Sequence, residues 1–164
     1  MDFKTEVVQL ERPNDFTVNT IIGMAHFMKT VDDIFEAIVN VNPNIKFGVA
    51  FCEASGDRKI LFEGTDQEMI DLAVKNAQKI GAGHSFVIFL GGTFPINIMH
   101  NLRIVPEITT IYCATSNPLQ IIVGETEQGR GILGVIDGGK PTRVETDVDK
   151  KERKKILRSL GYKS

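Results

Sequence analysis

Two histidines stand at positions where an imidazole can take part in phosphoryl transfer. His84 follows the glycines Gly81 and Gly83 at the start of a strongly apolar run, and His26 follows a separate extended run. An imidazole is nucleophilic and partly deprotonated near neutral pH, so either ring nitrogen can accept a phosphoryl group. The alternative interpretations are a strand-capping histidine for His84 and a partly buried loop histidine for His26.

One arginine and one glutamate lie in turns that can reach a ligand. Arg130 stands between Gly129 and Gly131, so no adjacent side chain hinders its guanidinium from binding a phosphate with two hydrogen bonds. Glu53 ends a predicted strand and is a candidate site acid. An ordinary exposed turn arginine and a solvated strand-end glutamate are the alternatives.

The sequence offers no metal-ligand spacing. A metal-dependent hydrolase would need His26, His84 and Glu53 to converge from distant loops, because no HxH, HxxxH or HxxE spacing links them. Cys52 and Cys113 lie in predicted strands without a CxxC neighbour or a histidine at ligand spacing. We therefore expect no metal site, and two free buried thiols instead of a disulfide.

A framework of strands and helices must position these residues. The apolar patterns predict strands over 3–10, 18–23, 45–52, 59–63, 84–90, 109–114, 119–123 and 132–136. They predict helices from 30 to a stop at 42–43, over 66–80, near 96–102 and around 156–160. Thr30 is the expected cap of the first helix, a capping box over 65–68 begins the second, and Gly81 closes it.

The composition indicates one α/β domain that spans residues 1–164. Apolar residues make up 42% of the chain and charged residues 24%, which is ordinary for a globular protein. We expect a compact domain with a mixed β-sheet of about eight strands and three or four helices. Small residues on one face of the third strand, Gly48, Ala50 and Cys52, indicate that another element packs closely against it.

The charge is unevenly distributed. Residues 140–164 contain nine Lys or Arg and four Asp or Glu, a charge of +5, so the net charge of −2 leaves −7 for residues 1–139. We interpret the basic segment as the solvated face of a terminal helix, because no aromatic residues interleave with its charges. No apolar run reaches the roughly 20 residues of a membrane span. We expect a cytoplasmic protein with no nucleic-acid or membrane partner.

Six segments carry a further pattern. They are 23–31 (GMAHFMKTV), 47–56 (FGVAFCEASG), 81–84 (GAGH), 94–97 (FPIN), 111–118 (IYCATSNP) and 129–138 (GRGILGVIDG). Together they resemble the adenosine-specific kinases of archaea and some bacteria, a family long described as a conserved domain of unknown function. Six matches in order are far more specific than one. Met24 and Ser116 are mild departures from the family pattern.

The resemblance implies a compact α/β domain that forms homotrimers or larger oligomers, binds adenosine, AMP, ADP or ATP, and carries phosphate on a histidine. His84 matches the phosphate-carrying histidine, and His26 lies in a matching segment as a second site group. His100 matches no family histidine. ATP or another adenine nucleotide is the implied cofactor, with Mg²⁺ as a candidate companion ion that no residue pattern specifies.

The working hypothesis is phosphoryl transfer between an adenine nucleotide and adenosine or a related acceptor, with His84 as the transient carrier. The phosphate would lie on Arg130 and on the backbone around Gly81, Gly83, Gly129 and Gly131. The candidates for nucleoside recognition lie in the matching loops and are Ser55, Phe94, Asn97, Asn117 and Glu53. The alternative is an oligomeric module that binds adenosine or adenine nucleotides without turnover.

The expected oligomer has limited support from the residues themselves. The segment 94–96 and the face formed by Gly48, Ala50 and Cys52 offer apolar surface that one domain need not cover. A homotrimer is the simplest assembly that the resemblance implies.

Overall fold

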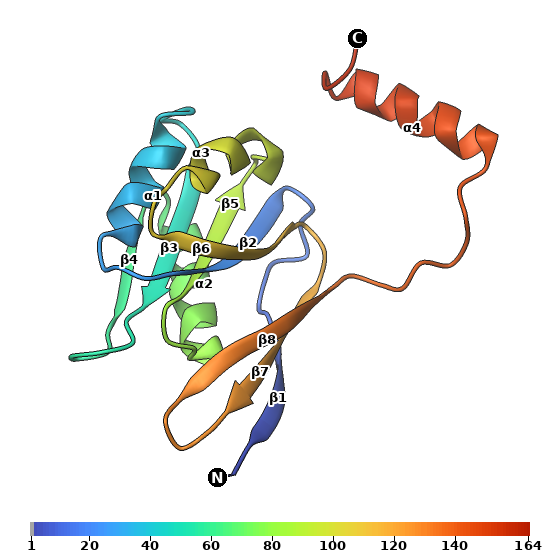
Figure 1. Ribbon diagram of the computed structural model, residues 1–164. Helices are drawn as coiled ribbons and strands as arrows, with labels where there is room; N and C mark the ends of the chain where they lie inside the picture. The colour runs from blue at the N-terminus through green and yellow to red at the C-terminus, as the bar shows by residue number, and fades with distance from the viewer. Residues whose placement is uncertain (1) are drawn as a thin grey trace.

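A computed structural model describes residues 2–164 of the chain (Figure 1). Within that range it contains eight strands and four α-helices, in agreement with the predicted numbers. The strands are β1 (Lys4–Gln9), β2 (Val18–Ala25), β3 (Lys46–Cys52), β4 (Ile60–Gly64), β5 (Ser85–Gly91), β6 (Ile108–Thr115), β7 (Leu119–Glu125) and β8 (Arg130–Asp137). The helices are α1 (Thr30–Val39), α2 (Gln67–Ile80), α3 (Met99–Arg103) and α4 (Asp147–Ser159), and a 3-10 turn, η1 (Pro95–Asn97), precedes α3.

The strands form two sheets in which every neighbouring pair is antiparallel. The five-stranded sheet has the order β4-β3-β5-β2-β6, and the three-stranded sheet has the order β1-β7-β8. The α/β class is confirmed, whereas two antiparallel sheets replace the predicted mixed one. β2 and β3 run in the same direction and are connected through α1, but β5 lies between them, so no parallel pair forms.

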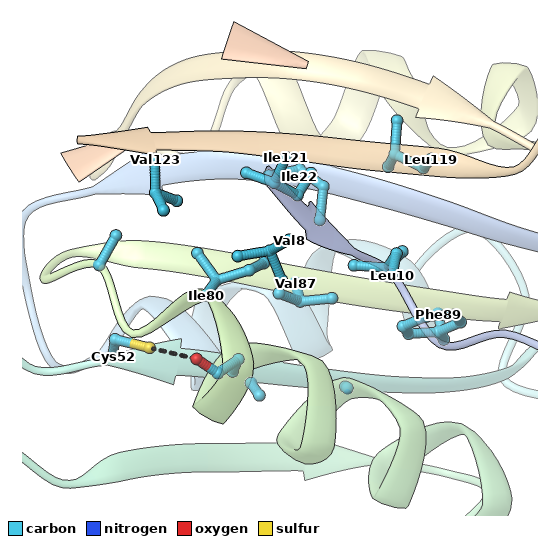
Figure 2. Close-up of a cluster of buried hydrophobic side chains, with 14 of the residues drawn as sticks. Val8, Leu10, Ile22, Cys52, Ile80, Val87, Phe89, Leu119, Ile121 and Val123 are labelled. Carbon is cyan, nitrogen blue, oxygen red and sulfur yellow. Dashed lines mark hydrogen bonds between the residues drawn. The ribbon is translucent and has the colours of Figure 1, made fainter. Parts of the chain in front are cut away.

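The five-stranded sheet is the central layer. One face packs against α1 and α3 through a buried cluster that includes Ile34 and Phe47. The other face packs against α2 and the three-stranded sheet through a second cluster, drawn in Figure 2, that includes Ile80 and Ile121. Because both faces are covered, the strand ends and the loops beyond them are the parts of this sheet that a ligand can reach.

Capping residues set the two ends of α2. The Asp66 carboxylate accepts a hydrogen bond from the Met69 N–H (3.2 Å), and Gly81 ends the helix with a φ of 59°. The closing glycine is as predicted, but Asp66 is the cap because the Thr65 hydroxyl donates to the Ile45 carbonyl instead (2.6 Å). A side-chain cap of this kind contributes about 1 kcal/mol to helix stability.

α1 begins without the predicted threonine cap. The Thr30 hydroxyl donates to the Phe27 carbonyl (2.5 Å), and Lys29 occupies the cap position with no side-chain hydrogen bond to the first turn. Asp32 and Asp33 lie in that turn, where the helix dipole favours negative charge.

Gly48 allows α2 to pack directly on β3. A Cβ here would lie 2.2 Å from the Ile70 nitrogen and 2.4 Å from the Met69 carbonyl carbon, so only glycine fits. Gly48, Ala50 and Cys52 are all buried, which confirms the predicted close packing against this face. The expectation that the same face is free for assembly is wrong, because α2 covers it within the chain.

The C-terminal segment after β8 extends away from the two sheets (Figure 1). α4 begins with a capping box at Thr146, and the Tyr162 hydroxyl donates to Asn97 Oδ1 at 3.2 Å. α4 contains no buried residue, and Ile156 and Leu160 are about half exposed. A helix of this length is only marginally stable in isolation, so its apolar side lacks the packing that such a helix normally needs.

None of the helices in residues 2–164 combines the length and the apolar character needed to cross a bilayer.

Candidate functional site

One edge of the five-stranded sheet brings together residues that are far apart in the sequence. β2 and β3 end at this edge, and β4, β5 and β6 begin there. Glu53 follows β3, His84 precedes β5, His26 follows β2 and Glu107 precedes β6, in the order in which these strands lie side by side. Neighbouring strands are about 4.8 Å apart, so the four residues form one row along the edge.

The backbone of His84 is held between two strands. Its N–H donates to the Cys52 carbonyl (2.7 Å), and its carbonyl accepts from the Ala25 N–H (2.9 Å). Its φ is 64°, a left-handed conformation that costs a non-glycine residue about 1–3 kcal/mol. The half-buried ring stacks on Phe51, with ring centroids 5.8 Å apart and planes inclined by 20°. Such conformations persist where the surroundings enforce them, and they are concentrated at functional sites.

His26 lies in the connection between β2 and α1, as predicted, and its side chain is exposed. Its Nδ1 is 3.0 Å from the carbonyl oxygen of Glu107, and its backbone N–H donates to the same oxygen (3.2 Å). A carbonyl oxygen only accepts hydrogen bonds, so Nδ1 carries the proton of the neutral ring and Nε2 keeps its lone pair. Nε2 is therefore the nitrogen of His26 that can act as a base or nucleophile.

A buried glutamate adjoins His26. Glu107 is 2% exposed, and neither oxygen of its carboxylate has a hydrogen-bond partner among the described residues. Lys29 Nζ lies 3.0 Å from Asp33 Oδ2 and 3.4 Å from Glu107 Oε1, and Asp33, followed by Glu107, raises the pKa of Lys29. The Lys29 ammonium is therefore held in its charged form by Asp33 first and lies beside the buried Glu107 side chain. The sequence gives no signal for this cluster, because a glutamate after a proline is typical of a solvated turn.

A pocket of about 760 Å³ opens at the same sheet edge. Its walls come from the β3–β4 loop, the end of α2 and the β7–β8 hairpin. It brings together all the residues predicted to bind phosphate, which are Gly81, Gly83, Gly129, Arg130 and Gly131, and it is also lined by Glu53. Loops that are separate in the sequence therefore form one cavity.

The Arg130 guanidinium is not free of neighbouring side chains, contrary to the expectation from its flanking glycines. Nη2 lies 2.9 Å from Glu6 Oε2, and Nη1 lies 3.6 Å from Glu125 Oε2. Its Nε is buried without a hydrogen-bond partner among the described residues. The pairing of β1 with β7 explains why the expectation fails. It places Glu6 beside the β7–β8 turn that carries Arg130, more than a hundred residues away in the sequence. A phosphate must therefore compete with Glu6 for this arginine.

Sequence reasoning missed a second arginine at the pocket. Arg58 lines the pocket from the β3–β4 loop and has a φ of 51°. A turn that also contains Ser55, Gly56 and Asp57 suggests a solvated hairpin end, so the residue pattern alone does not indicate a ligand contact. The unusual backbone conformation is visible only in the structure.

The His84 ring and the pocket lie on opposite faces of the sheet. The ring stacks on Phe51, which belongs to the cluster facing α1, whereas Cys52 lines the pocket and belongs to the cluster facing α2. Gly83 lies between them, and a Cβ on it would approach the Ala54 Cβ to 3.0 Å. A ligand that uses both groups has to pass over the strand edge at Gly83.

Three of the five residues predicted to recognise the nucleoside are distant from the histidines within the chain. Phe94 and Asn97 follow the opposite end of β5 from His84, about 20 Å away for a strand of this length. Asn117 lies at the end of the β7–β8 hairpin away from Arg130, and its side-chain amide donates to Asp137 (3.0 Å). The predicted set is therefore not assembled in one chain.

Glu53 and Ser55 are the remaining members of that set. Glu53 lines the pocket, and Ser55 lies in the β3–β4 loop between Glu53 and Arg58, where its carbonyl accepts a hydrogen bond from the Arg58 N–H (3.2 Å). Ser55 is thus placed beside the pocket, together with the phosphate-binding candidates.

Both thiols are free, as predicted. Cys52 is buried and its thiol donates to the Ala77 carbonyl (3.7 Å), the contact dashed in Figure 2. Cys113 is half-buried, and burial, followed by the charge of Asp137, raises its pKa to about 11. Within residues 2–164 no three histidine, cysteine, aspartate or glutamate side chains are grouped to hold a metal ion.

Comparison with known proteins matches nearly the full length of the chain. The family model described as "Adenosine specific kinase" matches residues 8–163. The crystal structure of PH1918 protein from Pyrococcus horikoshii OT3 is similar over 99% of this chain and 99% of that chain, with 42% sequence identity and a TM-score of 0.93. That match includes the C-terminal helix, since it spans nearly the full length of both chains. No curated protein is similar enough to count as a match.

Proposed function

This chain belongs to the adenosine-specific kinase family, and we propose that it binds adenosine and adenine nucleotides and transfers a phosphoryl group through a histidine at the edge of its five-stranded sheet. The observation that supports this most is that His84 and His26, at the ends of neighbouring strands, share one edge of the sheet with a pocket lined by glycines and by Arg130, which a ligand reaches from His84 by passing over Gly83. Phosphoryl transfer needs mainly position and positive charge around the transferred group, and this edge offers both.

His84 is the proposed phosphate carrier. A ring nitrogen of His84 attacks the γ-phosphorus of ATP, the bond from phosphorus to the bridging oxygen breaks, and ADP leaves with the electron pair. A hydroxyl of adenosine then attacks the phosphorus, loses its proton to a base and releases the imidazole. His26 follows the neighbouring strand β2, and its Nε2 is the candidate for that base.

The nucleotide phosphates are proposed to lie in the pocket. Arg130 contributes a guanidinium once Glu6 is displaced, and the backbone beside Gly81, Gly83, Gly129 and Gly131 lets a ligand approach closely. Each charge-assisted hydrogen bond contributes roughly 1.5–3 kcal/mol. Mg²⁺ would accompany a bound triphosphate, and no described residue group is assigned to it.

A homo-oligomer, most simply a trimer, is the proposed assembly. Ser55 lies beside the pocket, whereas Phe94, Asn97 and Asn117 reach a nucleoside site only if a neighbouring copy supplies them. Large apolar side chains are exposed on η1 and α4 and at their ends, among them Phe94 at 43%, Ile96 at 66%, Ile156 at 52% and Leu160 at 51%. These surfaces support assembly in place of the small-residue face that α2 covers.

A second candidate function is a sensor that binds adenine nucleotides without turnover. Two observations favour it: the His84 ring is stacked on Phe51, and Arg130 is already paired with carboxylates. Ligand binding would then exchange the partners of Arg130 and change the contact between the sheets. Phosphorylation of His84 would be a slow side reaction.

One experiment separates the two functions. The protein is incubated with ATP, with and without adenosine, and intact mass is measured together with the nucleotide products. The kinase hypothesis expects a mass gain that disappears when adenosine is added and AMP accumulates. A protein that binds adenosine but never gains mass or forms AMP is the sensor.

The proposed use of ATP and the two free thiols accord with a cytoplasmic location.

A further inference from the structure

The loop between β3 and β4 places an arginine at the mouth of the pocket. Arg58 lines the pocket together with Glu53 and Ala54 of the same loop, while Arg130 and Gly131 line it from the β7–β8 hairpin. The first group belongs to the five-stranded sheet and the second to the three-stranded sheet. A ligand in the pocket is therefore offered one arginine from each sheet.

The two arginines differ in the carboxylates around them. Arg130 is paired with Glu6 at 2.9 Å and with Glu125 at 3.6 Å. Among residues 2–164, no carboxylate oxygen lies within the 4.0 Å of an ion pair from the Arg58 guanidinium. Arg58 is exposed and carries a charge with which no carboxylate of the described residues pairs.

The acidic residues of its own loop are engaged with other partners. Asp57 pairs with the Lys59 ammonium at 2.9 Å, and Glu53 Oε2 accepts the Lys59 backbone N–H at 2.9 Å. Both contacts fix the loop while leaving the Arg58 guanidinium available. Lys59 does not line the pocket.

The backbone at Arg58 is strained, although the turn does not need an arginine at this position. Its φ of 51° is left-handed, and its N–H closes the turn on the Ser55 carbonyl. Gly56, two residues earlier, has a φ of 62°, the conformation that glycine adopts without steric cost. Glycine at position 58 would close the same turn, so the turn itself has no use for the arginine side chain.

We propose that Arg58 is the group that recognises the phosphate of a nucleotide in this pocket and makes the site prefer a nucleoside monophosphate to the nucleoside. The inference rests on the proposed function, because it assumes that an adenine nucleotide enters the pocket. A phosphate dianion accepts two parallel hydrogen bonds from one guanidinium. Arg58 can supply them without giving up an existing partner, whereas Arg130 has to leave Glu6.

The test titrates the full-length protein with adenosine and with AMP by calorimetry. Arg58→Ala should weaken AMP binding by about 10- to 100-fold, the loss expected for a charge-assisted pair, and change adenosine binding by less than about two-fold. The double variant Asp57→Asn, Lys59→Ala is the matched control. It removes a neighbouring positive charge together with the carboxylate that pairs with it, so no carboxylate is released beside Arg58, and it should leave both affinities unchanged.

Arg58→Gly separates recognition from folding. Glycine accepts a φ of 51° without strain, so this variant should have a Tm at or above that of the wild type and should still lose the preference for AMP. A lowered Tm with an unchanged preference would make Arg58 a structural residue and overturn the proposal. Equal losses of AMP binding in Arg58→Ala and in the double variant Asp57→Asn, Lys59→Ala would also overturn it.

If the wild type binds neither adenosine nor AMP, the proposed function fails, and inorganic pyrophosphate becomes the probe for Arg58. Saturable binding of pyrophosphate by the wild type, with a loss of about ten-fold or more in Arg58→Ala, supports the arginine as a phosphate-binding group. Equal binding by the two proteins, or no binding by either, overturns it.

Discussion

The backbone N–H of Ala25 donates a 2.9 Å hydrogen bond to the carbonyl oxygen of His84, so His26, the next residue, leaves the sheet beside His84. The two histidines share this sheet edge but differ in their ring contacts: the His84 ring stacks on Phe51, and His26 contacts the Glu107 carbonyl through Nδ1. Replacing each in turn therefore compares two imidazoles at one location.

His84→Ala should abolish the phosphoryl adduct formed with ATP, which is a mass gain of about 80 Da held by an acid-labile bond between phosphorus and a ring nitrogen. Adenosine binding should persist, because the ring is expected to contact phosphate and not the base. His26→Ala should keep the adduct and slow its transfer to adenosine. Intact-mass measurement of both variants checks this, and an adduct that survives in His84→Ala and disappears in His26→Ala reverses the two roles.

Glu6→Gln should strengthen AMP binding by up to about five-fold, the amount expected when a partly exposed ion pair no longer competes for Arg130. Adenosine binding should not change, because adenosine has no phosphate. Glu125→Gln is the control, with a smaller effect from its longer contact of 3.6 Å. Titration calorimetry measures all three proteins, and weaker AMP binding in Glu6→Gln would mean that Glu6 positions Arg130 for its ligand.

Arg130→Ala should weaken ATP and AMP binding much more than adenosine binding, because only the nucleotides present phosphate to the guanidinium. Raised salt should reproduce the effect weakly, since the pocket is open to solvent. Calorimetry at two ionic strengths is the measurement. Equal losses for nucleotides and nucleoside would assign Arg130 a structural role between the sheets.

Gly48→Ala should lower the free energy of unfolding by about 3 kcal/mol or more, because the new methyl group would overlap the backbone of α2. Gly134→Ala is the control: a Cβ at Gly134 has no atom within 4 Å, so its effect should stay within about 0.5 kcal/mol. Urea unfolding followed by circular dichroism compares the two. A tolerated alanine at position 48 would show that α2 can move away from β3.

The double variant Ile156→Asp, Leu160→Asp should convert the proposed oligomer to a monomer, because it places charge on the apolar side of α4. Lys154→Ala is the control, since position 154 lies about 200° around the helix from position 156 and should not affect assembly. Multi-angle light scattering gives the mass of each. A wild-type monomer at micromolar concentration would contradict the proposed assembly.

Cys113 should react slowly with thiol reagents at pH 8. Its pKa is raised to about 11, so only a small fraction is thiolate, and the rate should rise about ten-fold per pH unit up to that value. The measurement uses Cys52→Ser, so that one thiol reports, and the same variant in guanidinium supplies the unfolded rate. A rate that levels off near pH 9 would place the pKa of Cys113 at its ordinary value.

The local elements of this fold are largely predictable from the sequence. α2 has an apolar side of Met69, Ala73, Ala77 and Ile80 between an aspartate cap and a closing glycine, so periodicity and terminal residues both identify it. The capping residue of a helix is harder to predict, because a threonine hydroxyl can donate to any of several nearby carbonyls. Thr30 and Thr65 both bond to carbonyls outside their helices.

The arrangement of the site depends on long-range pairing, which local patterns do not determine. The glycine-flanked Arg130 and the glycines at 81 and 83 are recognisable in the sequence, but the pairing of Arg130 with Glu6 follows from the position of β1 beside β7. The placement of β5 between β2 and β3 likewise makes His26 and His84 neighbours. Strain at Arg58 and burial of Glu107 arise only once the chain has folded.

The pocket exists only where the two sheets meet, because its walls are the β3–β4 loop and the end of α2 on one side and the β7–β8 hairpin on the other. A nucleotide bound there would therefore stabilise the contact between the two sheets. At a free nucleotide concentration of 100 times the Kd, it would add about 2.7 kcal/mol to the free energy needed to separate them. Amide protons of β7 and β8 would then exchange with deuterium more slowly in the loaded protein, so cellular nucleotide concentration would set how long this hairpin stays docked.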